Sequence, residues 1–297
     1  MEAVVTDLDG TVIRADGTVS ELTLHAARAL RDRGVPLIAA TARTPFGVEA
    51  LPTLAPVLTS AVCCSGAVGY APGSRDLPRA DWLPGADRLP RDLPRADWLP
   101  GADRLPRDLL WADRLPRDLV ADLVAHLGAG AGLALFDGRG WAMTATYTAI
   151  RGGGHRGPQA VVAQRALLEV DACSMVICHP ELTAPEIVAA LRGEGFGPGR
   201  VTLTYAEHRF VQATAPAVDK ASGVLRALRA AGAAPEHTIA FGDMPIDVAM
   251  FAVVGHSVAM ADAPAEVLAA ATLRTGSVED DGFAHALVRL GVVPGPA

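Results

Sequence analysis

The sequence predicts an α/β protein in which a parallel-sheet core is interrupted by an inserted α+β domain. Apolar strands alternate with amphipathic helices near the N-terminus, and the same alternation resumes in the last third of the chain. The stretch between them lacks it. Strand, helix and strand at this spacing form a βαβ unit, whose strands lie parallel in one sheet. We therefore expect a Rossmann-like core formed by residues 1–69 and 212–297, with residues 70–211 inserted.

Short signals define the elements of the first part. Residues 3–6 are apolar and predict a buried strand. Residues 20–34 predict a helix, because Ser20 suits the N-cap and apolar residues recur on one face until a terminating glycine. Residues 35–41 and 59–66 predict two further strands.

The remaining elements follow from the same signals. Pro116 and Gly128 suit the beginning and the end of a helix. We expect, in order, a helix at 117–127, a hairpin at 132–138 and 140–148, a helix at 158–170, a strand at 173–179, a helix at 184–195, one or two strands at 200–214, a helix at 219–232, a strand at 237–243, a helix at 245–255 and a strand at 256–260.

A tandem repeat interrupts the inserted stretch. The sequence "RDLPRADWLPGADRLP" at 75–90 recurs unchanged at 91–106, and a partial copy continues to residue 118. Its frequent prolines disfavour a long helix and a sheet interior. Because the copies are identical, we interpret them as a recent duplication and expect a mobile, passive loop over 75–118. A partner-binding role for Trp82 and Trp98 is the alternative.

Composition excludes several classes of protein. The net charge of -7 disfavours a general nucleic-acid binder. No apolar run reaches about 18 residues, so no membrane span is expected. The N-terminus lacks the pattern of a signal peptide. The four cysteines form no zinc or disulfide pattern, which predicts buried free thiols in a cytoplasmic protein.

Lysine and asparagine usage is extreme. The chain contains no asparagine, and Lys220 is its only lysine, whereas the other 25 of its 26 basic residues are arginine. A lysine kept against this bias indicates a position that arginine cannot fill. Chance retention is the alternative.

Two aspartates follow the first strand in "VVTDLDGTVI". Asp7 and Asp9 occupy positions i and i+2, so both carboxylates face the same side at the sheet edge where α/β proteins bind ligands. Two like charges there are costly without a cation, and Mg²⁺ prefers oxygen ligands. Asp7 is then a candidate nucleophile that forms an aspartyl-phosphate, and Asp9 a candidate general acid and base. A solvated turn is the alternative.

Three more segments strengthen the catalytic interpretation. Thr41 and Arg43 follow the second strand, where they suit contacts with phosphate oxygens. Lys220 begins a helix after the inserted stretch, where its ammonium suits both phosphate and Asp7. Asp243 and Asp247 end a late strand and offer a second pair of acids for the metal, so the expected metal residues are Asp7, Asp9, Asp243 and Asp247.

These residues resemble the four motifs of the haloacid dehalogenase superfamily of phosphohydrolases. "DLDGT" is similar to the first motif, "ATAR" to the second, Lys220 to the third and "GDMPID" to the fourth. The inserted domain resembles the large α/β cap of the Cof-type subfamily. The resemblance implies Mg²⁺-dependent hydrolysis of a small phosphorylated metabolite, such as a sugar phosphate. It further implies that Asp7 and Asp243 bind Mg²⁺ through side chains and Asp9 through its backbone carbonyl.

Three positions depart from the family pattern. Ile246, Ser65 and Asp262 stand where the family usually has asparagine. Ser65 and Asp262 remain polar, but Ile246 cannot form a side-chain hydrogen bond, so we interpret it as a lesion that weakens metal binding. A packing role for Ile246 is the alternative. These departures leave open a catalytically weakened metabolite-binding protein. A phosphomannomutase-like mutase also remains open, because such mutases share the four motifs.

Overall fold

The computed structural model describes residues 1–72, 109–152 and 155–295. The chain divides into two compact units, Met1–Leu77 with Lys220–Ala297, and Pro78–Asp219. The two full copies of the repeat, with Trp82 and Trp98, lie outside the described residues. The loop expected to extend to residue 118 is wrong at its end, because Leu109–Ala112 form a strand and a helix begins at Arg117.

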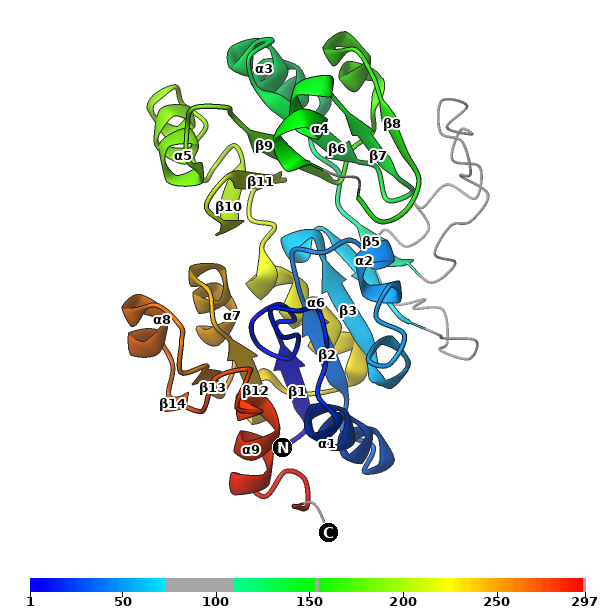
Figure 1. The fold of residues 1–297 in the computed structure, drawn as a ribbon, viewed down its shortest axis with the longest axis vertical. Coiled ribbons are helices and arrows are strands. Elements are labelled where there is room, and N and C mark those ends of the chain that lie inside the picture. Colours follow the sequence, from blue (N-terminus) through cyan, green and yellow to red (C-terminus); the bar gives the residue numbers. More distant parts are fainter. Residues whose placement is uncertain (73–108, 153–154, 296–297) are drawn as a thin grey trace. The chain divides into compact units, whose positions relative to one another are not determined.

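The first unit is built on a largely parallel sheet (Figure 1). β1 is central and pairs in parallel with β2 on one side and β12 on the other. β13 and β14 continue the parallel pairing beyond β12, and β3 continues it beyond β2, whereas β4 is antiparallel to β3. The sheet confirms the expected α/β class. Across it the strand order is β14 (Leu273–Arg274), β13 (His256–Ala259), β12 (Thr238–Gly242), β1 (Ala3–Thr6), β2 (Leu37–Ala40), β3 (Ser60–Cys63), β4 (Val68–Tyr70) and β5 (Leu109–Ala112).

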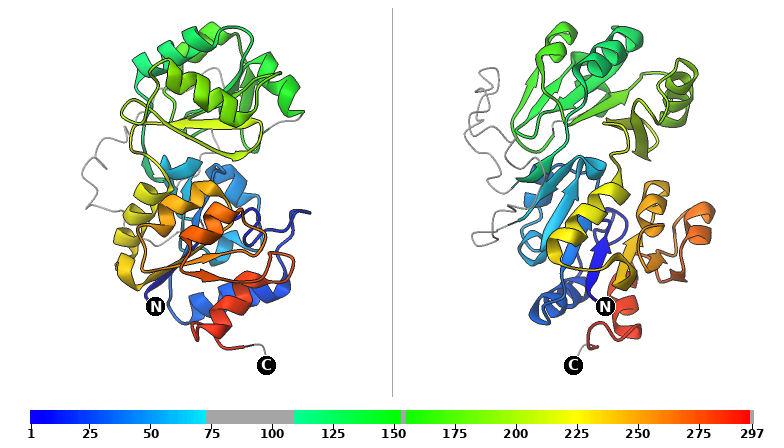
Figure 2. Two further views of the ribbon diagram at one scale, coloured as in Figure 1. Left: turned by 90° about the vertical axis from the view of Figure 1, so that its left-hand side faces the viewer. Right: turned by 180° about the vertical axis from the view of Figure 1, so that it is seen from behind.

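Helices cover this sheet. In Figure 2, α1 and α9 lie side by side as the blue and red helices, and they pack together. The Ser20 hydroxyl accepts the Thr23 N–H at 3.0 Å and caps α1, as expected. The helices are α1 (Glu21–Asp32), α2 (Pro45–Glu49), α6 (Lys220–Ala231), α7 (Val248–Phe251), α8 (Ala265–Ala270) and α9 (Gly282–Arg289), with short 3-10 turns at Ala55–Val57, Cys64–Gly66, Pro235–His237 and Pro245–Asp247.

Close packing fixes α6 against the sheet. Gly223 faces β3, where an added Cβ would lie 2.3 Å from Cγ1 of Val62. The absent side chain lets the helix approach the strand closely. This approach fixes the start of α6, and therefore Lys220, beside the carboxyl ends of the central strands.

The second unit contains a six-stranded sheet between helices. Its strands pair antiparallel, apart from the parallel pair β7 and β8. One face carries an aliphatic core that includes Leu123, Leu133 and Ile187. The strand order of this sheet is β10 (Thr202–Glu207), β11 (Phe210–Thr214), β9 (Ser174–Cys178), β6 (Gly132–Phe136), β7 (Trp141–Met143) and β8 (Gln159–Val161). Its helices are α3 (Arg117–Leu127), α4 (Ala145–Arg151) and α5 (Ala184–Gly193).

Two expected elements of this unit are wrong. The helix predicted at 158–170 is instead β8 followed by a 3-10 turn at Gln164–Glu169, because β8 completes the sheet by pairing with β7. The second arm of the predicted hairpin ends at Met143, since Thr144 caps α4 by accepting the Tyr147 N–H. In both cases a backbone partner or cap outweighed the pattern of the residues.

The boundary expected at residues 211 and 212 would divide β11. That strand pairs with β9 and β10, which belong to the second unit.

No helix within the described ranges is long and apolar enough to cross a membrane. All four cysteines are buried and carry free thiols, as expected.

Candidate active site

The turn after β1 is set by one carbonyl and one glycine. The carbonyl of Leu8 accepts the N–H groups of Thr11, Val12 and Ile13 at 3.3, 3.0 and 2.8 Å, which folds the chain back sharply. Gly10 has a φ of +83°, and an added Cβ there would lie 2.4 Å from Oδ2 of Asp243. Glycine is therefore required both for the turn and for the approach of Asp243.

Lys220 joins two of the predicted acids. Its ammonium donates to Oδ1 of Asp7 at 2.7 Å and to Oδ1 of Asp247 at 2.6 Å. The side chains of Lys220, Asp7 and Asp247 are 1%, 8% and 0% exposed, so these ion pairs are shielded from water. The expected contact between Lys220 and Asp7 is thus present in the structure.

Asp247 also organises the loop after β12. Its second oxygen, Oδ2, accepts the backbone N–H groups of Asp243 and Met244 at 3.1 and 3.0 Å. Asp243 is held from the other side by Thr11, whose hydroxyl donates to Oδ1 of Asp243 at 2.6 Å. Sequence reasoning assigned no role to Thr11, although it lies in the quoted "DLDGT" segment.

We call Asp7, Asp243, Asp247 and Lys220 the carboxylate cluster. Oxygens from its three acids lie within 4.8 Å of one another. When all four residues are ionised, three negative charges face one positive charge. Burial, reinforced by the neighbouring carboxylates and opposed by Lys220, raises the pKa of Asp7 to about 8. Burial also raises the pKa of Asp243 to about 6.

Lys220 stays charged in this surrounding. Burial by itself lowers the pKa of its ammonium, but the carboxylates of Asp247 and Asp7 outweigh that effect and raise the pKa. One lysine nevertheless leaves an excess of negative charge. Three converging carboxylates with this excess fit a divalent cation, and their hard oxygen donors suit Mg²⁺.

Asp9 lies apart from this cluster. Its carboxylate accepts from Nε and Nη2 of Arg43 at 2.7 and 2.5 Å, and its side chain is 57% exposed. Thr41, at the end of β2, is buried, and its hydroxyl oxygen accepts the Arg43 N–H at 3.1 Å. The predicted residues therefore form two groups: the carboxylate cluster, and Asp9 with Arg43 and Thr41.

The three substituted asparagine positions have different surroundings. Ser65 is buried with a φ of +52°, and its N–H donates to the Thr41 carbonyl at 3.0 Å. Asp262 is exposed after β13. Ile246 is buried, at 9% exposure, in the 3-10 turn Pro245–Asp247.

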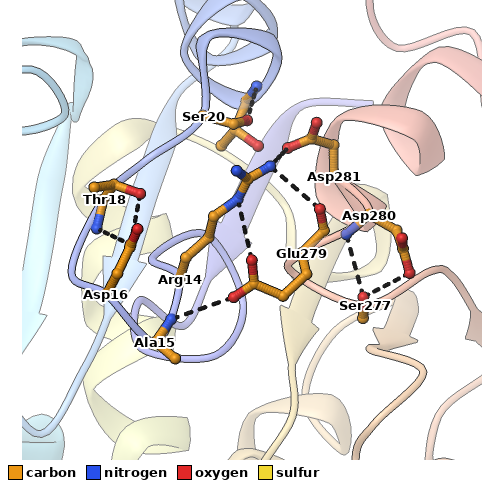
Figure 3. Close-up of polar contacts among 10 residues, drawn as sticks. Arg14, Ala15, Asp16, Thr18, Ser20, Ser277, Glu279, Asp280 and Asp281 are labelled. Atoms are coloured by element: carbon orange, nitrogen blue, oxygen red, sulfur yellow. Dashed lines mark hydrogen bonds and ion pairs between the residues drawn. The ribbon is translucent and has the colours of Figure 1, made fainter.

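A surface network anchors the chain just beyond the turn (Figure 3). Arg14 donates from Nη2 to Oδ1 of Asp281 at 3.1 Å and to the Glu279 carbonyl at 3.2 Å. The Glu279 carboxylate lies 3.7 Å from Nε of Arg14 and accepts the Ala15 N–H at 3.4 Å. These contacts fasten the loop that follows Ile13 to the turn before α9.

Comparison with solved structures shows the same fold over nearly the whole chain. The HAD subclass IIB sugar phosphatase BT4131 is 17% identical, with a TM-score of 0.75 over 99% of this chain and 100% of that chain. The phosphatase BT1666 from Bacteroides thetaiotaomicron is 17% identical, with a TM-score of 0.73 over 99% and 96%. A haloacid dehalogenase-like hydrolase from B. subtilis is 16% identical, with a TM-score of 0.76 over 98% and 100%.

The family follows from the sequence itself. No curated protein matches the chain significantly. A family profile described as haloacid dehalogenase-like hydrolase matches residues 4–75 and 110–287, which include every residue of the carboxylate cluster. The match spans well over half of the chain and confirms the expected resemblance: this protein belongs to the haloacid dehalogenase-like hydrolase family.

Proposed function

We propose that the chain is a Mg²⁺-dependent phosphatase that hydrolyses phosphate monoesters of small phosphorylated metabolites through an aspartyl-phosphate on Asp7. The observation that carries the proposal is the buried carboxylate cluster, in which three acids face one lysine at the carboxyl ends of parallel strands. Membership of a hydrolase family supports it. The sugar phosphatase with the same fold makes sugar phosphates the first substrates to test.

The cluster suggests how Mg²⁺ is held. We propose that the side chains of Asp7 and Asp243 and the backbone carbonyl of Asp9 bind it. When bound, the ion supplies positive charge that offsets both the carboxylates and the substrate phosphate. Asp247 was also expected among the metal residues. Because both of its oxygens already accept hydrogen bonds from the protein, we propose that it contributes by positioning Lys220 and the Asp243 backbone.

The hydrogen bond from Lys220 distinguishes the two oxygens of Asp7. Lys220 binds Oδ1 of Asp7, so we propose that Oδ2 attacks the phosphorus while the bond to the substrate oxygen breaks. Asp9, after it has taken up a proton from solvent, gives that proton to the leaving oxygen, and it afterwards accepts a proton from the water that hydrolyses the aspartyl-phosphate. Nucleophilic attack and proton transfer are thus divided between the buried Asp7 and the exposed Asp9.

Thr41 and Lys220 are suited to bind the phosphate group. The Thr41 hydroxyl oxygen accepts the Arg43 N–H, and its own hydrogen is the one we propose to donate to a phosphate oxygen. The Lys220 ammonium has three N–H bonds, two of which are directed to carboxylates, and we propose the third for phosphate.

One observation favours a second candidate, a metabolite-binding protein with weakened turnover. Ile246 places a buried apolar side chain directly before Asp247, where the family usually has a polar amide. Weak metal binding would then limit catalysis while leaving phosphate recognition in place.

Phosphate release tests the proposal directly. The purified protein is assayed with p-nitrophenyl phosphate and a panel of sugar phosphates, in Mg²⁺ and in EDTA. We expect turnover that requires Mg²⁺ and is lost in Asp7→Asn. Asp32→Asn, which changes an exposed carboxylate of α1, serves as the matched control and should retain activity.

Three other outcomes would replace the proposal. Turnover that persists in EDTA and in Asp7→Asn would exclude the cluster as the site. Binding of the phosphates without hydrolysis would favour the metabolite-binding protein. Isomerisation of a sugar phosphate on addition of a sugar bisphosphate would favour the mutase.

A further inference from the structure

We propose that Arg43 holds the Asp9 carboxylate while the phosphate site is empty and releases it when a phosphate group binds to Arg43. The inference rests on the proposed function. It adds that binding of the substrate controls when Asp9 can transfer a proton. Under it, Asp9 becomes free to act only when a phosphate is present.

Each of the three guanidinium nitrogens of Arg43 donates a hydrogen bond to a protein acceptor. Nε and Nη2 donate to the two oxygens of Asp9 at 2.7 and 2.5 Å, and Nη1 donates to the Gly47 carbonyl at 3.3 Å. This two-point geometry is the one by which arginine also binds two oxygens of a phosphate. A phosphate that binds the edge formed by Nε and Nη2 therefore competes with Asp9 for Arg43.

The Arg43 backbone is fixed beside the proposed phosphate site. Its N–H donates to the hydroxyl oxygen of Thr41 at 3.1 Å, and its carbonyl accepts the Cys64 N–H at 2.8 Å. The stem of its side chain lies against Gly47, where an added Cβ would be 3.1 Å from Cβ of Arg43. An exchange of partners therefore needs movement only of the guanidinium and the Asp9 carboxylate.

Asp9 has the freedom that the exchange requires. Its side chain is 57% exposed and that of Arg43 is 30% exposed. In contrast, the Asp9 backbone is fixed, because the turn after β1 pairs it with Ile13. The carboxylate can thus change direction while the carbonyl proposed to bind Mg²⁺ stays in place.

The exchange makes a quantitative prediction about affinity. Breaking the ion pair between Arg43 and Asp9 costs free energy and so weakens phosphate binding. The cost is small, because an ion pair this exposed contributes only modestly to the free energy. Removing the Asp9 charge should therefore strengthen phosphate binding about three- to five-fold, but only if Arg43 is present. A carboxylate that merely repelled phosphate would act whether or not Arg43 is present.

A double-mutant cycle separates these two cases. Binding of orthophosphate in saturating Mg²⁺ is measured by calorimetry for the wild type, Asp9→Asn, Arg43→Gln and the double variant. We expect tighter binding in Asp9→Asn, weaker binding in Arg43→Gln, and less than a two-fold effect of Asp9→Asn when Arg43 is already replaced. Circular dichroism checks that each variant is folded.

The remaining outcomes overturn the inference. Equal tightening in both backgrounds would mean that Asp9 simply repels the anion. Unchanged affinity in Arg43→Gln would mean that Arg43 does not bind phosphate, and the proposed function would still stand if Asp7→Asn abolishes Mg²⁺-dependent turnover. Failure of the wild type to bind orthophosphate, together with absence of that turnover, would overturn the inference and the proposed function together.

Discussion

Two polar networks hold the segment that follows β1, and they differ in how water reaches them. In the carboxylate cluster the side chains of Asp7, Asp247 and Lys220 are at most 8% exposed. In the surface network of Arg14, Glu279 and Asp281, the side chains are 27%, 59% and 21% exposed (Figure 3). Both contain more carboxylates than cations.

Both networks have an excess of negative charge, but its effect differs because one network is buried and the other is exposed. Water screens the excess charge around Arg14, so that network costs little and stabilises little. In the cluster, burial, reinforced by the neighbouring carboxylates, raises the pKa values of Asp7 and Asp243. A buried imbalance destabilises the fold unless a bound cation offsets it, which points to a functional rather than a structural origin of the cluster.

Removing the lysine should have the largest effect. Lys220→Met leaves Asp7 and Asp247 buried without their cation, so we expect a loss of about 3–5 kcal/mol in the free energy of unfolding, together with loss of turnover. Lys220→Arg keeps the charge, but its larger forked group does not fit a site that is 1% exposed, so activity should fall strongly. Urea unfolding and phosphate release measure both effects, and near-normal rates in Lys220→Arg would refute the requirement for lysine.

Asp7→Asn should separate activity from stability. Turnover should fall by at least about 1,000-fold, because the nucleophile is lost. The free energy of unfolding of the metal-free variant at pH 7 should be unchanged or higher. Burial raises the pKa of Asp7 to about 8, so folding of the wild type at pH 7 has to take up a proton that asparagine does not need, and Lys220 keeps Asp247 as a partner. A metal-free variant that is less stable than the wild type by more than about 2 kcal/mol would mean that Asp7 is mainly structural.

Ile246→Asn tests whether the departure from the family pattern weakens the metal site. We expect a lower Mg²⁺ concentration for half-maximal rate, with a loss of about 2 kcal/mol in stability because a buried aliphatic side chain is removed. Ile246→Val is the matched control, with a loss of about 1 kcal/mol and no change in Mg²⁺ dependence. If the wild type and both variants had the same Mg²⁺ dependence, and Ile246→Asn had a much lower melting temperature, Ile246 would serve only packing.

The surface network should give the smallest effect. Arg14→Gln removes ion pairs to Asp281 and Glu279 that are partly exposed, so the loss in stability should stay below about 1 kcal/mol. Raising the salt concentration should narrow the difference between this variant and the wild type. A loss as large as that of Lys220→Met would abolish the contrast between the two networks.

The sequence was sufficient to predict that strands from the first and last parts of the chain share one parallel sheet. The carboxyl ends of parallel strands lie at one edge of a sheet, so β1 and β12 bring Asp7 and Asp243 to the same edge. The helix that begins at Lys220 starts at this edge, where Lys220 contacts Asp7. The pairing of Asp9 with Arg43 and of Thr11 with Asp243 could not be predicted, because it depends on side-chain rotamers across segments distant in sequence. The strand β8 was missed because its partner, and not its own residues, decides its conformation.

The pH dependence of stabilisation by Mg²⁺ tests the central claim most directly. Without metal, the pKa of Asp7 is raised from 3.8 to about 8, so the folded state binds the extra proton and its stability falls as pH rises from about 4 to 8. Mg²⁺ competes with protons for the carboxylates, and the pKa of Asp243 is about 6. The melting temperature is measured with and without Mg²⁺ at steps from pH 6 to 8.5 for the wild type and for Asp243→Asn. We predict a stabilisation by Mg²⁺ that grows across this range in the wild type and is largely lost in Asp243→Asn. A stabilisation that is absent, or equal at every pH and in both proteins, would contradict a metal site in the carboxylate cluster.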